Sequence, residues 1–178
     1  MAKNSFHNFQ NWGTIVALII SVLALVVSVY ETNLMAEQQR ATVWPYLYII
    51  KNFKEDRFQL QLENNGTGPA IIESVEVSYH GQLVEDYFEL LELFQPGHQV
   101  DSSTLRFSRL SEQVIRSGAS RSIFEAYWSE EFIEMLEQFN EVDIKINYCS
   151  VLNECWVYDF QTNQRREGKF RARKEFDS

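Results

Sequence analysis

Histidine and cysteine are scarce in this sequence, and their scarcity limits the chemistry that the chain can carry. Its 178 residues include three histidines, which are scattered with no pair at metal-ligand spacing, and two cysteines. The six-residue separation of Cys149 and Cys155 is not the redox Cys-x-x-Cys pattern, and two cysteines alone do not make a zinc site. The hydrolase and protease motifs G-x-S-x-G and H-E-x-x-H are absent as well. We therefore expect no enzymatic activity, no cofactor and no metal site.

Basic residues are also few, and most of the chain is acidic. The formal net charge is −9, and residues 1–164 hold 10 Lys and Arg against 22 Asp and Glu. Because phosphate affinity needs a basic surface, we expect no general nucleic-acid binding. The acids at helical spacing in 85–92 and 130–137 are expected to line solvated helix faces, since calcium and glycosidase sites need inward, convergent carboxylates.

Charge is absent altogether from one long stretch, Gly13 to Tyr30. Its eighteen residues rise roughly 27 Å as a helix, about the thickness of a bilayer's hydrocarbon core. Trp12 and Tyr30 bracket the stretch, as aromatic residues do at the headgroup level. The pattern predicts one transmembrane helix over residues 12–30, after a short polar tail over 1–11. A cleaved signal peptide is the alternative, but Leu34 stands where a cleavage site at Ala36 needs a small residue.

The flanking charges and the next residues bear on topology. Lys3 precedes the span and only Arg40 follows within about twenty residues, a slight bias towards an inner amino terminus and an outer domain at the cell membrane. Residues 31–43 contain no Gly or Pro and are rich in helix formers, which predicts a helical stalk that ends before Pro45. A solvated linker is the other reading of the same residues.

Small residues recur along one face of the predicted membrane helix. Such a face lets two helices approach closely in lipid, which predicts a homo-oligomer or a membrane-protein partner besides membrane lipid itself. The alternative is the ordinary abundance of Ala, Gly and Ser in membrane helices. The face consists of Gly13, Ala17, Ser21, Ala24 and Ser28.

Residues 44–164 have the strand signals of a β-rich domain. We expect strands, a breaker-rich loop at Asn64–Pro69, an amphipathic helix over Leu83–Phe94, a polar loop to residue 103 and a helix capped by Ser129. In the loop, Gly66 and Gly68 are expected to supply unusual backbone angles, and no phosphate site is expected because a strand follows. The strands are expected at Trp44–Lys51, Arg57–Glu63, Ala70–His80, Thr104–Leu110, Glu112–Arg116 and Arg121–Ala126, the last two joined by residues 117–120.

The clearest hairpin is the last one, over residues 142–160. A register centred on Leu152 pairs Tyr148 with Trp156, and it continues to Ile146 with Tyr158 and Ile144 with Phe160, all facing the core. The same register places Cys149 and Cys155 opposite each other on the other face. In an oxidising compartment the pair is expected to form a disulfide, and in a cytosol two thiols.

Three short motifs in order resemble a loosely defined group of bacterial single-span membrane proteins of unknown function. The motifs are Trp44-Pro45-Tyr46-Leu47, the loop NNGTGPA ending at Ala70, and Tyr148-Cys149-Ser150. In the group the loop reads N-x-G-x-G-P-A, so this chain has one extra residue from Asn64 or lacks the spacer from Asn65. The resemblance implies a β-sandwich on a membrane anchor and no established activity.

The last fourteen residues, 165–178, reverse the charge of the body. They hold six basic and three acidic residues and are treated as a basic tail. Contact with anionic lipid, docking on the acidic body or on a partner, and a disordered end are the open readings. The basic residues are Arg165, Arg166, Lys169, Arg171, Arg173 and Lys174.

Together these patterns predict a mainly β fold. We expect a β-sandwich of immunoglobulin or fibronectin style with one or two covering helices, carried by an N-terminal transmembrane helix. The expected function is a membrane-anchored, non-catalytic interaction or sensory module. The alternatives are a subunit of a larger membrane complex held by the small-residue face, and a membrane-tethered hydrolase or thiol enzyme whose site is not readable in the sequence.

Overall fold

The computed structural model describes residues 3–97 and 104–176, and it divides the chain into two compact units. The first unit is Met1–Ala41 and the second is Thr42–Ser178. Most of the loop predicted up to residue 103, including His98, lies outside the described residues.

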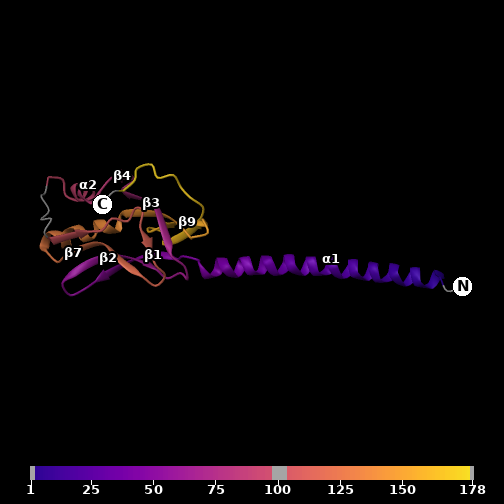
Figure 1. Cartoon of the computed structure of the whole chain (residues 1–178). Helices are drawn as coiled ribbons and strands as arrows, with labels where there is room; N and C mark the ends of the chain where they lie inside the picture. Colours follow the sequence, from indigo (N-terminus) through magenta and orange to yellow (C-terminus); the bar gives the residue numbers. More distant parts are fainter. Residues whose placement is uncertain (1–2, 98–103, 177–178) are drawn as a thin grey trace. The chain divides into compact units, whose positions relative to one another are not determined.

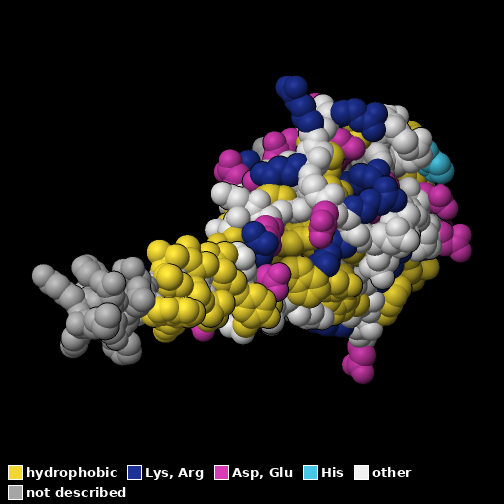
Figure 2. Space-filling view, turned by 90° about the vertical axis from the view of Figure 1, so that its right-hand side faces the viewer, with side chains coloured by type: hydrophobic (Ala, Val, Ile, Leu, Met, Phe, Trp, Pro, Cys, Tyr) yellow, Lys and Arg dark blue, Asp and Glu magenta, His cyan; other side chains and the backbone are white. Residues whose placement is uncertain are grey.

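The first unit is occupied by one helix, α1 (Lys3–Thr42). Between Trp12 and Thr42 it is long and apolar enough to cross a membrane, and Figure 2 shows its apolar side chains. The helix begins within the predicted polar tail and continues unbroken through residues 31–42, so the predicted stalk is helical. The described side chains of the helix are exposed.

The second unit is built from two antiparallel sheets (Figure 1). The four-stranded sheet has the order β1-β2-β7-β5, and the six-stranded sheet has the order β10-β9-β8-β3-β4, with β6 paired to β3. The first sheet consists of β1 (Leu47–Phe53), β2 (Arg57–Asn64), β7 (Ser120–Tyr127) and β5 (Leu105–Phe107). The second consists of β10 (Gln164–Glu167), β9 (Cys155–Asp159), β8 (Val142–Cys149), β3 (Ala70–Tyr79), β4 (Gln82–Val84) and β6 (Val114–Ile115).

One hydrophobic core joins the two sheets. Alternate residues of the strands enter it, as the two-residue period of a strand requires. Its centre is aromatic: Phe124 lies 6.3 Å from Phe58, 6.1 Å from Phe132 and 4.8 Å from Phe139, measured between ring centroids. The predicted fold class is therefore confirmed: among the described residues the sheets are antiparallel, and one of the three α-helices is the long apolar helix at the amino terminus.

Two short helices and a 3-10 turn complete the fold. They are α2 (Tyr87–Phe94), α3 (Glu130–Leu136) and η2 (Gln138–Asn140). Asp86 caps α2 by accepting a hydrogen bond from the Glu89 amide at 2.8 Å, and Ser129 caps α3 as predicted, accepting from the Phe132 amide at 3.1 Å.

The helix predicted over Leu83–Phe94 is too long at its amino end. His80 and Gly81 both have positive φ angles, 49° and 80°, and reverse the chain in a tight turn. The next residues pair with β3 as strand β4, with Gln82 opposite Tyr79. Leu83 and Val84 of the predicted helix therefore belong to β4, and α2 begins only at Tyr87.

The strands predicted on either side of residues 117–120 are present as β6 and β7. They belong to different sheets, because β6 pairs with β3 whereas β7 pairs with β2 and β5. The boundary drawn between residues 164 and 165 falls inside β10, which pairs with β9. The hairpin register of residues 142–160 is confirmed, including Tyr148 opposite Trp156 and the Phe160 amide donating to the Ile144 carbonyl at 2.9 Å.

Candidate functional site

The segment that enters the sandwich is held by the side chain of Asn64. This side chain is fully buried and makes four hydrogen bonds. Its Oδ1 accepts from the amides of Tyr46 and Gly66, each at 3.0 Å, and its Nδ2 donates to the carbonyls of Gly68 and Ile115, each at 2.9 Å. One amide group thus fixes the loop after β2, the start of β1 and the end of β6.

The two glycines of this loop are needed for a reason other than the predicted one. Neither Gly66 nor Gly68 has a positive φ angle. A Cβ on Gly66 would overlap the carbonyl of Trp44, and one on Gly68 would overlap the backbone of Val43. Glycine is therefore required because the backbone of this loop lies directly against the backbone of residues 43–46, which lead from α1 into β1.

An aromatic–arginine cluster lies where β1, the edge of one sheet, faces β10, the edge of the other. We call it the aromatic flank and define it as Trp44, Tyr46, Trp156 and Arg165. The Arg165 guanidinium carbon lies 4.2 Å from the Trp44 ring centroid, 5.1 Å from that of Tyr46 and 5.6 Å from that of Trp156. Its Nη1 also donates to the Pro45 carbonyl at 3.4 Å. The outer rings remain partly open, with Trp44 37% and Tyr46 40% exposed.

Two buried tyrosines support the flank from the core side. The Tyr158 hydroxyl accepts a hydrogen bond from the Ile49 amide at 3.1 Å, which satisfies an outward-facing amide of the edge strand β1. The Tyr148 hydroxyl is buried as well. Burial raises the pKa of both phenols, with the charge of Arg165 opposing the shift at Tyr148. Both tyrosines are therefore neutral structural groups at physiological pH.

The aromatic flank has the chemistry of a contact surface. Cation–π contact fixes the guanidinium over the rings, so little side-chain entropy remains to be lost on binding. Trp, Tyr and Arg are the residue types that most often dominate the binding energy of protein interfaces. Figure 2 shows a face of this unit on which Lys and Arg side chains lie among apolar ones.

A cleft lies beside the hairpin that carries the two cysteines. Cys149 and Cys155 are joined in a disulfide, and Cys155 lines a cleft of about 470 Å³ together with Trp156, Glu167 and Lys169. The carboxylate of Glu73 lies within 4.8 Å of both sulfurs. Because the sulfurs are bonded to each other and Glu73 pairs with Lys169 at 2.7 Å, this group is not a metal site in the disulfide form.

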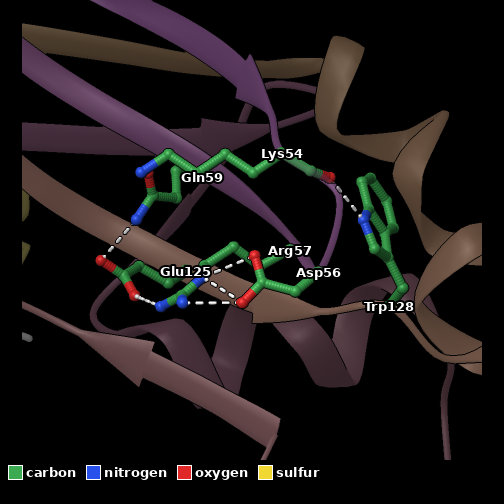
Figure 3. A network of polar contacts seen from close by, with 6 residues as sticks. All are labelled: Lys54, Asp56, Arg57, Gln59, Glu125 and Trp128. Carbon is green, nitrogen blue, oxygen red and sulfur yellow. Dashed lines mark hydrogen bonds and ion pairs between the residues drawn. The ribbon is translucent and has the colours of Figure 1, made fainter.

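The outer face of the four-stranded sheet carries a network of polar contacts (Figure 3). Glu125 accepts from Gln59 Nε2 at 2.8 Å and pairs with Arg57 at 3.3 Å, and Arg57 also pairs with Asp56 at 2.7 Å. Burial raises the pKa of Glu125, but polar contacts from Ser122, Arg57 and Gln59 outweigh it, so its net pKa is lowered. Asp56, Arg57 and Glu125 are thus paired with one another, and their charged groups do not point together into a ligand cavity.

The basic residues predicted as a tail are engaged with the domain. Arg165 belongs to the flank and, with Arg166, to β10. Lys169 pairs with Glu73, Arg173 lies 4.0 Å from Glu76, and Lys174 pairs with Glu85 and Glu89 at 3.3 and 3.1 Å. Arg171 is exposed. The sequence left three alternatives for this segment: contact with lipid, docking on the acidic body or a partner, and disorder. The observed ion pairs are those expected for docking on the acidic body.

The small residues of α1 lie along an exposed helix. Ala17 accepts a hydrogen bond from the Ser21 hydroxyl at 2.8 Å, and Gly13 has no atom within 4 Å of the position of a Cβ. Ser28 accepts in the same way from Thr32 at 2.8 Å, and Ala24 is exposed. The hydroxyl of Ser21 is therefore satisfied within its own helix.

The sequence pattern did not predict the roles of three residues, Asn64, Trp44 and Tyr46. Asn64 was grouped with the loop breakers, and only its place two residues before Gly66 pointed to an Asx-type turn. Trp44 and Tyr46 were assigned to the first strand, and their alternation with Pro45 was a signal that both lie on the same face.

A family model described as Domain of unknown function (DUF8453) matches residues 11–171. No curated protein matches the chain. No solved structure matches it either.

Proposed function

The chain belongs to the DUF8453 family, whose description assigns no function, and we propose from its geometry that it is a membrane-anchored, non-catalytic module that binds a protein partner. The observation that carries the proposal is the aromatic flank. Trp44 and Tyr46 are partly exposed, and Arg165 is held against both rings. A rigid Trp–Tyr–Arg cluster on the edge of a sandwich is well suited to act as the central contact of an interface.

The position of the flank in the chain favours a partner that is itself near the membrane. Trp44 follows the end of α1 by two residues, which span about 7 Å at most. Helix α1 extends twelve residues beyond Tyr30, roughly 18 Å of helix rise. A partner that contacts the flank therefore binds within a short tether of the anchor.

The state of the carboxylates supports a non-catalytic role. A catalytic acid needs a free path to substrate and a pKa near the working pH. Asp56 and Glu125 contact Arg57, and Glu73 and Glu89 contact lysines, so these acids are committed to structural pairs. The pKa of Glu89 is lowered by the Glu85 amide and by Lys174, which is the wrong direction for a general acid.

The disulfide supports an outer location of the domain. Cross-links between cysteines persist in oxidising compartments and are rare in the cytosol. Joined cysteines at 149 and 155 therefore agree with the slight charge bias that places the amino terminus inside. Reporters fused after Ser178 that work only outside or only inside the cell distinguish the two sides.

Photo-crosslinking in native membranes tests the partner proposal. The photoreactive residue p-benzoylphenylalanine is placed at Tyr46 in the full-length chain, and as a matched control at Phe88, which is 63% exposed on α2. We expect a protein adduct of one mass from position 46 that disappears when Arg165→Ala is added. The proposal is wrong if position 46 gives no protein adduct, or gives the same adducts as position 88.

A second candidate is a subunit of a larger membrane complex held by α1. The observation that favours it is the apolar helix surface, with small residues aligned on one face and the Ser21 hydroxyl already bonded to Ala17. Replacing Ala17 and Ser21 with Leu should weaken association between copies in a membrane two-hybrid assay. Leu at Ile15 and Val22, on another face, is the control. An unchanged signal from the first pair contradicts this candidate.

A further inference from the structure

The last described residues, 168–176, cross the outer face of the six-stranded sheet, and we call them the strap. Figure 1 shows this segment passing from the side of β9 to the side of α2 and β4. The strap begins at Gly168, whose φ angle of 117° turns the chain away from β10. Burial then alternates, with residues 170, 172, 174 and 176 facing the domain and 169, 171, 173 and 175 exposed. This alternation is that of an extended peptide lying on a surface.

The sheet contacts the backbone of the strap through two buried polar side chains. Asn147, 3% exposed on β8, accepts from the Phe170 amide at 3.1 Å and donates to the Phe170 carbonyl at 2.6 Å. Glu76, also buried, accepts from the Arg173 amide at 2.9 Å. These bonds recognise extended main chain and do not depend on the side chains of the strap.

The end of the strap fills a gap in the pairing of β3. The edge of β3 pairs with β6 at Ala70–Ile71 and with β4 at Val77–Tyr79. Between these pairs, the Val75 carbonyl accepts from the Phe176 amide at 2.9 Å, and Ser111 donates to the Phe176 carbonyl at 3.3 Å. The Phe176 ring is 4% exposed and lies 4.7 Å from that of Tyr87, edge to face. A single phenylalanine is thus buried in the hydrophobic core against the Tyr87 ring, at the edge of β3.

Charge complementarity extends along the same path. Lys169 pairs with Glu73 at its start, and the Lys174 ammonium pairs with Glu85 and Glu89 near its end. The groove beneath the strap therefore combines a backbone-reading amide, acidic side chains and an aromatic pocket. These are the elements with which sheets recognise extended peptides.

From this arrangement we infer that the groove on β3 and β8 is a binding site for an extended basic peptide segment of a partner protein, one with a lysine two residues before a phenylalanine. The strap occupies the site as an internal competitor. Glu73, Glu76, Tyr87, Glu89 and Asn147 lie inside the family match, which ends at residue 171, whereas Arg173, Lys174 and Phe176 lie beyond it.

The groove lies on the outer face of its sheet, away from the aromatic flank, so the two proposals rest on different residues. A missing crosslink from position 46 would contradict the flank proposal alone. Missing peptide binding would contradict the groove proposal alone. The groove is tested by its own variants.

The test uses the full-length chain in detergent micelles with a protease site inserted between Gly168 and Lys169. The probe is a fluorescent peptide with the sequence of residues 168–176. After cleavage and dilution we expect saturable peptide binding. Before cleavage, a tethered strap at an effective concentration of about 1 mM should weaken the apparent binding by about a thousandfold for a site with a Kd of about 1 µM.

Peptide variants show whether binding depends on the lysine and on the phenylalanine two residues after it. A peptide carrying Lys174→Glu and Phe176→Ala should bind at least tenfold more weakly, because it loses the acidic contact and the aromatic pocket. A peptide carrying Arg171→Ala is the matched control, since Arg171 is exposed and faces away, and it should bind within twofold of the parent. A cleaved chain carrying Asn147→Ala should also bind at least tenfold more weakly.

Three outcomes overturn the inference. One is a cleaved chain that keeps its β circular dichroism but binds no peptide. Another is equal binding of the parent and the doubly substituted peptide. The third is unfolding of the domain when the cut strap dissociates, because the strap is then part of the fold and not a ligand.

Discussion

Replacing Asn64 with alanine is the sharpest test of how this domain is held together. The change removes four hydrogen bonds and leaves the amides of Tyr46 and Gly66 without their partner inside the protein. A net contribution of about 1 kcal/mol per bond gives a loss of about 4 kcal/mol, and two orphaned amides alone cost at least about 2 kcal/mol. Against a typical total of about 5–15 kcal/mol, either loss is large.

The loss is measured by urea unfolding of the full-length chain in detergent micelles, followed by tryptophan fluorescence. The free energy of unfolding should fall while the slope against urea stays the same. Asn65→Ala is the matched control: the Asn65 side chain is exposed and donates a hydrogen bond at 2.8 Å to the Tyr48 hydroxyl, so the change in the free energy of unfolding should stay within about 0.5 kcal/mol. If Asn64→Ala costs less than about 1 kcal/mol, the loop does not depend on this side chain and the reasoning is refuted.

Three further predictions concern the same domain. Gly68→Ala should destabilise it by about 1–3 kcal/mol in the same urea assay, because the new Cβ meets the backbone of Val43, and an unchanged midpoint would contradict the close approach. Reduction of the Cys149–Cys155 bond should cost about 2 kcal/mol by loop entropy, and a chain with serine at both positions should no longer respond to the reductant. The pKa of Glu125 is lowered, so its stabilising effect is present above the unfolded-state pKa and disappears as pH falls through the folded-state pKa. Thermal melts of Glu125→Gln and the parent should therefore differ at pH 7 and converge as pH falls below the folded-state pKa.

The sequence predicted most accurately the features that depend on local periodicity. The hairpin of residues 142–160 alternates apolar and polar residues on both strands, so its register, and with it the opposition of Cys149 and Cys155, followed from the pleat alone. The charge-free run from Gly13 identified a helix long enough to cross a membrane, because its length matches the hydrocarbon core.

Features that depend on distant partners could not be predicted. Arg165 was grouped with a basic tail by composition, whereas its partners Trp44 and Tyr46 stand about 120 residues earlier in the chain. Asn64 is buried against the general preference of asparagine for the surface, and only four convergent backbone groups make that burial favourable. Residue type alone predicts the average environment of an arginine or an asparagine. It could not predict the aromatic contacts of Arg165 or the burial of Asn64.

The loop after β2 holds the short segment that joins helix α1 to the proposed binding surface. The Trp44 carbonyl accepts from the amides of Thr67 and Gly68 at 2.8 and 3.2 Å, and the Tyr46 carbonyl accepts from the Asn65 amide at 2.8 Å. The same short segment therefore carries the covalent link from α1 and both exposed rings of the aromatic flank. Because its backbone is bonded on alternate residues to one rigid loop, Trp44 and Tyr46 are held in place despite lying next to a tether. A loosened loop would free both rings from Arg165, so variants at Asn64 that remain folded should weaken partner binding as well as stability.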